Sequence, residues 1–233
     1  MIIRSFQFWL ILLCFTAICC NTEKSTRTVD TEPSTESQDS KPQDKNVESE
    51  SKSDDERMTW QKPSEVINAM GDISDKVVVD LGAGIGYFAF KLLTKCEKVI
   101  AVDIAKDKIE ILNGFKTTLN PDLQAKLDTR LATVNDPNLK KGEADIILIV
   151  NTIAFLQPRV SYLENLKKFL KPSGQIFIVD YKSKRVPDYV PAPDFEERLY
   201  IHILEDQLEA AGYQNIVADD TTLEYQYIIS ASI

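Results

Sequence analysis

A glycine-rich turn constrains the fold of this chain more than any other feature of its sequence. Gly82, Gly84 and Gly86 alternate directly after a β-branched run at 77–79, and apolar residues at helical spacing follow over 87–95. Glycine has no Cβ, so the backbone can turn tightly there and a ligand can come close to it. The pattern therefore predicts a strand, a ligand-binding turn and a helix, which together begin a parallel βαβ unit.

The rest of the chain after residue 57 continues this alternation. Short apolar runs predict further strands at 99–102, 127–131, 146–150, 175–179, 215–218 and 225–229. Amphipathic stretches predict helices at 104–119, 160–170 and 195–211, the first of them ended by Asn120-Pro121. Such alternation is typical of a doubly wound α/β sheet with helices on both faces, here as one domain over 58–233.

Two acidic residues accompany the glycine turn. Asp80 comes just before the glycines, and Asp103 ends the second expected strand, 23 residues further on. The spacing Gly-x-Gly-x-Gly with a preceding carboxylate differs from the Gly-x-Gly-x-x-Gly of dinucleotide binders, and a carboxylate suits an amino or cationic group better than a pyrophosphate. A carboxylate at the end of the second strand can accept bonds from both hydroxyls of a ribose. The sequence thus predicts a site for a nucleoside-like ligand that also carries an amino or positive group.

These motifs resemble those of the class I S-adenosylmethionine-dependent methyltransferases. The residues that carry the resemblance lie at 77–88, 99–104, 144–152, 170–181 and 208–213. The resemblance implies a Rossmann-like, seven-stranded, mostly parallel sheet in the order 3-2-1-4-5-7-6, with strand 7 antiparallel. It also implies S-adenosyl-L-methionine as the cofactor. The methyl acceptor is left unassigned, and we expect it to be a small molecule.

Position by position, the resemblance assigns nine residues to the cofactor. Asp80 and the glycine-turn backbone match the groups that hold the methionine part, and Asp103 matches the acceptor of the ribose hydroxyls. Ile104 matches a residue packed on the adenine, with Thr133 and Val134 at the adenine edge, where many relatives carry an aspartate. Asn151 matches a residue beside the transferable methyl group. The expected cofactor-binding residues are Asp80, Gly82, Gly84, Gly86, Asp103, Ile104, Thr133, Val134 and Asn151.

No histidine is placed to act as a general base. Relatives of the most similar appearance often carry paired histidines shortly after the residue that matches Asn151, whereas this chain has Ala154 and Phe155. Methyl transfer is an in-line displacement, so alignment can supply much of the catalysis, but an amine or alcohol acceptor must still lose a proton. Asn151, Asp180 and Tyr181 are the remaining polar candidates for a catalytic role.

Other features have a structural interpretation or exclude a function. His202 is expected to be a packing or surface residue of the last helix, and Cys96 a small semi-buried residue. Because these are the only histidine and the only cysteine after residue 20, we expect no thiolate or imidazole metal site. The net charge of -9 argues against a nucleic-acid-binding protein. Trp60 belongs to a segment that resembles the family's leading helix over the cofactor, and a Pro-rich stretch at 189–195 is expected to cover the substrate entrance.

The first 57 residues are predicted to be a targeting signal and a flexible linker. Residues 1–20 combine a basic start with a short apolar run, which favours a secretory signal over a membrane-spanning helix. The closing pair Cys19-Cys20 resembles the end of a bacterial lipoprotein signal, with Cys20 or Cys19 as the lipidated residue. An uncleaved N-terminal anchor is the alternative, and both interpretations attach the rest of the chain to a membrane. Residues 21–57 are polar and charged, so we expect a disordered linker that cannot bury enough apolar surface to fold.

The predicted export signal conflicts with the expected cofactor. A lipoprotein of the bacterial cell envelope is attached to a membrane, whereas S-adenosylmethionine is made in the cytosol. The sequence therefore leaves two hypotheses open. The first is a methyltransferase, and the second is a membrane-tethered, non-catalytic module that binds a nucleoside-like ligand on the same fold. The oligomeric state is not predicted.

Overall fold

The structure, a computed structural model, describes residues 56–233. The expected signal at 1–20, its Cys19 and Cys20, and the expected linker up to residue 55 lie outside the described residues. Residues 56–61 are helical, so helix already includes the last two residues that the sequence assigns to the linker. Within the described part of the chain, no helix is long and apolar enough to cross a membrane.

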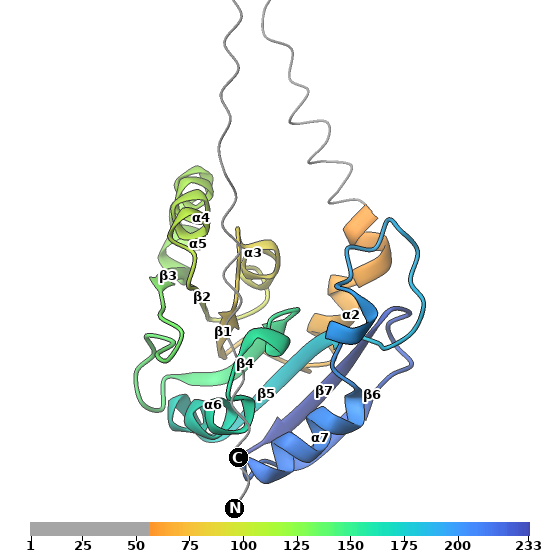
Figure 1. Cartoon of the computed structure of the whole chain (residues 1–233). Helices are drawn as coiled ribbons and strands as arrows, with labels where there is room; N and C mark the ends of the chain where they lie inside the picture. The colour runs from red at the N-terminus through yellow and green to blue at the C-terminus, as the bar shows by residue number, and fades with distance from the viewer. Residues whose placement is uncertain (1–55) are drawn as a thin grey trace, which may run out of the picture. The chain divides into compact units, whose positions relative to one another are not determined.

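A single seven-stranded sheet organises the described residues (Figure 1). Its order is β3-β2-β1-β4-β5-β7-β6, in which β7 runs antiparallel to both of its neighbours and the other pairs are parallel. This confirms the doubly wound, Rossmann-like fold and the strand order expected from the sequence. The strands are β1 (Val77–Leu81), β2 (Lys98–Asp103), β3 (Leu127–Leu131), β4 (Ala144–Val150), β5 (Leu170–Tyr181), β6 (Gln214–Asp219) and β7 (Gln226–Ser232).

Helices cover both faces of the sheet because successive strand residues point to opposite sides. In β1, Val79 packs into a core cluster with residues of α6 and α7, whereas Val78 packs into a second cluster with residues of α2, α3 and α4. Figure 1 shows the helices that form these two layers. The helices are α2 (Pro63–Asn68), α3 (Tyr87–Leu92), α4 (Lys106–Thr118), α5 (Pro121–Lys126), α6 (Arg159–Leu166) and α7 (Ile201–Ala210), with single 3-10 turns η1 (Ile153–Phe155), η2 (Lys167–Phe169) and η3 (Phe195–Glu197).

The structure corrects the bounds of two elements. The helix expected over 160–170 ends at Leu166, and β5 begins at Leu170, five residues before the strand expected over 175–179. A shift of register between Ala144 and Ile146 in the β4–β5 pair accommodates this extension. The helix expected over 195–211 begins only at Ile201. The guanidinium of Arg198 donates to the carbonyl oxygens of Pro193 and Lys184, which holds the preceding segment as a loop.

Candidate functional site

The glycine turn lies at the carboxyl end of β1 and has left-handed backbone. The φ angles of Gly82, Gly84 and Gly86 are 85°, 56° and 100°. A Cβ on Gly82 would lie 2.2 Å from the hydroxyl oxygen of Thr152, so the loop after β4 packs directly on this backbone. A Cβ on Gly84 would meet no atom within 4 Å. The turn is therefore closed by protein at Gly82 and faces open space at Gly84.

Asp103 connects this turn to the end of β2. Its Oδ2 accepts a hydrogen bond of 2.8 Å from the Gly84 amide, and its Oδ1 accepts one of 2.8 Å from the Ala105 amide. Each carboxylate oxygen can accept a second bond, so both remain able to take a hydroxyl group. Two backbone bonds thus fix the orientation of this carboxylate before any ligand arrives.

A cavity of about 280 Å³ lies beside Asp103. Three apolar side chains on its wall are largely open to solvent, with exposed fractions of 61% for Ile104, 64% for Val134 and 78% for Phe155. Apolar surface of this kind is available to pack on a planar, weakly polar ring such as a purine. The cavity is lined by Leu81, Gly82, Val102, Asp103, Ile104, Ala132, Thr133, Val134, Asn151, Thr152, Phe155, Leu156 and Tyr162.

Six of the nine expected cofactor-binding residues line this smaller cavity, and three do not. Gly84 forms the turn beside it, and the backbone of Gly86 packs on Phe90 of α3, where a Cβ would lie 2.6 Å from the ring. Asp80 is buried beneath the turn and lines neither this cavity nor the one described below. The expected contact of Asp80 with the methionine part of a cofactor stays a prediction.

Burial dominates the chemistry of Asp80. Its side chain is 2% exposed, and desolvation raises the pKa of the carboxyl to about 7, opposed by the amide of Ala89 and the charge of Arg57. Its Oδ2 has no hydrogen-bond partner among the residues that the structure describes. Asp80 therefore carries a carboxylate that the fold alone does not satisfy.

Thr133 has a local role in the loop after β3. Its hydroxyl accepts a bond of 3.1 Å from the Asp136 amide, and its own amide donates to the Asp136 carbonyl at 2.9 Å. The residue therefore shapes the loop that presents Val134 to the smaller cavity.

Asn151, at the carboxyl end of β4, is held by a chain of side-chain hydrogen bonds. The backbone of Asn151 is left-handed, with φ 54°, and its Nδ2 donates to the Tyr181 hydroxyl at 3.4 Å. Its Oδ1 accepts a bond of 2.5 Å from Gln226 of β7, whose Oε1 accepts one of 3.1 Å from Gln61. Gln61 accepts in turn from Arg57 at 2.6 Å. We call these five residues the amide relay.

The amide relay was not expected from the sequence. Gln61 and Gln226 are fully buried, and each makes its bond to a residue that is distant in the chain. The only local signal is a glutamine at the start of the last strand, directly before the apolar residues 227–229. Because every donor in the relay faces an acceptor, the side-chain amide of Asn151 has one defined orientation.

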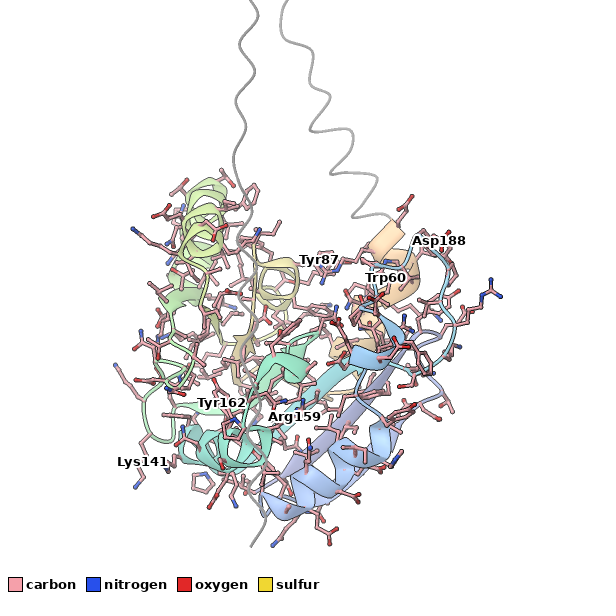
Figure 2. The ribbon with its side chains drawn as sticks, in the orientation of Figure 1. Trp60, Tyr87, Lys141, Arg159, Tyr162 and Asp188 are labelled. Atoms are coloured by element: carbon pink, nitrogen blue, oxygen red, sulfur yellow. The ribbon has the colours of Figure 1, made fainter. Side chains whose placement is uncertain are left out.

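A second cavity of about 660 Å³ lies beside the first, and both are lined by Asn151 and Phe155. One wall is aromatic, since Trp60 stacks on Tyr181 with ring centroids 6.0 Å apart. Figure 2 shows Trp60, from the first helical segment. The complete lining is Arg57, Trp60, Asn151, Ala154, Phe155, Asp180, Tyr181, Pro191, Ala192, Pro193 and Glu197.

All three expected catalytic candidates line this larger cavity. Asp180 is 4% exposed; its Oδ1 accepts a bond of 2.7 Å from the Tyr181 amide, and its Oδ2 has no partner among the described residues. Burial raises the pKa of this carboxyl to about 6, opposed by the backbone bond and by the charge of Arg159. Burial likewise raises the pKa of Tyr181 to about 12, so its hydroxyl stays protonated at neutral pH.

The surroundings of Cys96 and His202 fit structural roles. The side chain of Cys96 is buried more deeply than expected, and burial raises the pKa of its thiol to about 11, which makes it unreactive. His202 is exposed and lies beside the ring of Tyr200, with centroids 5.6 Å apart. Over residues 56–233, no group of three or more His, Cys, Asp or Glu side chains is arranged to hold a metal ion.

Comparison with known proteins shows a similarity to methyltransferases. Residues 79–178 match the family model described as a methyltransferase domain. The chain is 24% identical to phosphoethanolamine N-methyltransferase 1 of Arabidopsis thaliana over 67% of this chain and 32% of that protein. It is 25% identical to tRNA U34 carboxymethyltransferase of Aliarcobacter butzleri over 65% of this chain and 52% of that protein. The chain thus spans about a third to a half of the length of these relatives.

Solved structures show the same fold. A SAM-dependent methyltransferase from Aquifex aeolicus aligns with a TM-score of 0.70 and 21% identity, covering 80% of this chain and 97% of that one. Phosphoethanolamine N-methyltransferase 2 of Haemonchus contortus, in complex with S-adenosyl-L-methionine, aligns with a TM-score of 0.60 and 10% identity, covering 74% of this chain and 52% of that one. The described residues therefore have the fold of the S-adenosylmethionine-dependent methyltransferases, and residues 79–178 match the methyltransferase-domain model.

Proposed function

We propose that this protein transfers a methyl group from S-adenosyl-L-methionine to a small-molecule acceptor. The observation that carries the proposal is the arrangement of the two cavities, which share Asn151 and Phe155. The smaller one has the features of a nucleoside site, and the larger one has room and polar groups for a second molecule. A ligand in each would bring donor and acceptor together at their common wall, as a displacement requires.

The residues around the smaller cavity fit the cofactor. Asp103 is oriented to accept bonds from the ribose hydroxyls, and the exposed faces of Ile104 and Val134 can enclose the adenine. The open backbone at Gly84 leaves space for the methionine part. When bound, the cofactor supplies a methyl group activated by a positive sulfur atom. Within this arrangement, Asn151 helps to align the reacting groups, since the amide relay fixes its side chain.

The acceptors named for the relatives differ, and we do not carry any of them over. The names of two relatives refer to phosphoethanolamine and to tRNA. A small molecule agrees better with a cavity of about 660 Å³ and with a chain whose net charge is -9 than a nucleic acid does.

Calorimetry with the purified full-length protein tests the proposal. We expect S-adenosylmethionine and its demethylated product to bind with micromolar affinity, and adenosine alone to bind more weakly. An absence of heat at millimolar cofactor would refute the proposed function. Labelled cofactor can then be offered with acceptors of different chemistry to detect transfer.

We also propose that the domain is attached to the bacterial cell envelope through Cys20 or Cys19. Support comes from the basic and apolar start of the chain and from the polar stretch that separates it from the domain. Metabolic labelling with a fatty acid tests this: label in the wild type that is lost in Cys20→Ser or in Cys19→Ser is the expected result. No label in the wild type would refute lipidation.

A further inference from the structure

We propose that the methyl acceptor is a small amine without a phosphate group, and that Asp180 binds its cationic form and takes its proton. The inference rests on the proposed function and deepens it by naming the acceptor class. It depends on the charges that line the larger cavity, on an unsatisfied oxygen of Asp180 and on the aromatic wall.

The charges along the larger cavity favour a cation. Two acidic residues, Asp180 and Glu197, line it, and Arg57 is its one cationic lining residue among those described. Arg57 already has protein partners, since its guanidinium carbon lies 3.7 Å from the centroid of the Tyr87 ring and its Nε donates to Gln61. A phosphate carries a charge of about -1.5 to -2 at neutral pH, and its binding sites supply several hydrogen-bond donors, for example from a cluster of arginines. The lining offers a phosphate more repulsion than attraction.

Asp180 provides a specific place for the ammonium group. Asp180 lines the cavity, and its Oδ2 is buried and accepts no hydrogen bond from any described residue. Arg159 lies near enough to influence the carboxylate, but its guanidinium donates to the Ile153 and Ala154 carbonyls and to the Gln207 side chain. A buried acceptor of this kind is costly unless it is paired, so a donor supplied by a ligand would satisfy it.

The protonation state of Asp180 suits this role. Burial raises the pKa of the carboxyl to about 6, so most molecules carry the ionised form at neutral pH while the group remains a better proton acceptor than an ordinary aspartate.

Aromatic faces complete the cation site. Trp60, Tyr181 and Phe155 line the same cavity, and aromatic rings attract ammonium groups through their electron-rich faces.

The ammonium form of the acceptor gives one proton to Oδ2 of Asp180 and becomes a neutral amine with a free electron pair. The amine nitrogen forms a bond to the methyl carbon as the bond between that carbon and sulfur breaks, and the electron pair of the broken bond stays on sulfur. The methylated product leaves as an ammonium ion, and Asp180 then returns its proton to water.

Two matched pairs of acceptors test the inference with the full-length protein and labelled cofactor. Ethanolamine and phosphoethanolamine differ only in the phosphate, and phenethylamine and 2-phenylethanol differ only in the nucleophile. We expect kcat/KM at least tenfold higher for ethanolamine than for phosphoethanolamine, and for phenethylamine than for the alcohol. The reverse order in either pair, or cofactor binding without transfer to either amine, would overturn the inference.

Substitution of Asp180 tests its own role. In Asp180→Asn we expect amine methylation to fall at least about 100-fold, the usual range for loss of a general base, while the calorimetric affinity for S-adenosylmethionine stays within threefold. Asp188→Asn is the matched control, because Asp188 is an exposed acid of the loop after β5 that lines neither cavity (Figure 2). Unchanged amine methylation in Asp180→Asn overturns the assignment. If the wild type does not bind S-adenosylmethionine at all, the proposed function is refuted instead. Failure of the Asp180 assignment and failure of the proposed function are therefore distinguishable.

Discussion

The contact between Gly82 and Thr152 gives a sharp prediction about how the site is held together. Gly82→Ala adds a Cβ that would lie 2.2 Å from the Thr152 hydroxyl oxygen, 2.6 Å from its Cγ2 and 2.9 Å from its Cβ. The same substitution at Gly84 adds a Cβ that meets nothing within 4 Å. Because both residues have positive φ, the two variants share the backbone strain and differ in the steric clash.

The free energies of unfolding of the two variants can be estimated from these terms. Left-handed backbone costs a non-glycine residue about 1–2 kcal/mol, and overpacking costs about 1–3 kcal/mol. We therefore expect Gly84→Ala to lose about 1–2 kcal/mol and Gly82→Ala about 2–5 kcal/mol. For a domain of this size, each kcal/mol lowers the melting temperature by about 2–4 °C, so Gly82→Ala should melt clearly below Gly84→Ala.

Thermal unfolding of a double-mutant set measures the clash itself. Thr152→Ala removes two of the three contacting atoms, so combined with Gly82→Ala it should recover about 1–2 kcal/mol of the overpacking. Combined with Gly84→Ala, it should be additive within about 0.5 kcal/mol. Equal stability of Gly82→Ala and Gly84→Ala, or the same coupling of Thr152 to both, would refute the packing between the glycine turn and the loop after β4.

Three further predictions concern the ligand site and its support. Asp103→Ala should weaken binding of S-adenosylmethionine by about 10- to 150-fold, since hydrogen bonds to a charged group contribute about 1.5–3 kcal/mol. Calorimetry measures this affinity, and a change of less than threefold would contradict the proposed contact of Asp103 with the ribose. Gln226→Leu leaves the fully buried Gln61 amide without its acceptor and the Asn151 oxygen without its donor, so it should lower stability by about 1–3 kcal/mol in thermal unfolding. An unchanged melting temperature would speak against the amide relay. The pKa of Asp80 is raised from its ordinary value of 3.8 to about 7 in the folded state. Between about pH 4 and pH 7, the folded state therefore holds a proton that the unfolded state has released, and this group makes stability fall as pH rises through that range. Asp80→Asn should flatten that slope in unfolding curves taken across the range, and an unaltered slope would contradict it.

Much of the sheet could be predicted because its signals are local. The apolar runs in β1, β2 and β4 and the alternating glycines lie in short stretches of sequence, and the resemblance supplied the strand order. A helix was missed where one signal has two meanings. Asn120-Pro121 follows the end of α4, as expected, and it also begins α5, where Asn120 accepts a bond of 2.9 Å from the Leu123 amide and Pro121 occupies the first turn.

The site could be predicted where it follows the ends of consecutive strands, and it could not where it depends on distant partners. Asp103 and Asn151 end β2 and β4, so their place at one edge of the sheet follows from topology. Gln61 and Gln226 are 165 positions apart, and nothing in either local sequence indicates that they meet. The orphaned oxygen of Asp180 is likewise a property of the packed structure, because only burial distinguishes it from any other aspartate at the end of a strand.

The same oxygen weighs against a non-catalytic binder, the rival hypothesis from the sequence. A protein that only binds a nucleoside-like ligand needs the smaller cavity and Asp103, and it gains nothing from a second cavity that holds an unsatisfied, buried Asp180. Such a group lowers stability at neutral pH, since its folded pKa of about 6 lies above the unfolded value of 3.8. Stability given up at a fixed position is typical of a site that performs chemistry. In an enzyme, Asp180→Asn should therefore keep the cofactor affinity, melt no lower than the wild type and lose turnover, whereas in a binder it would alter neither affinity nor any measurable activity.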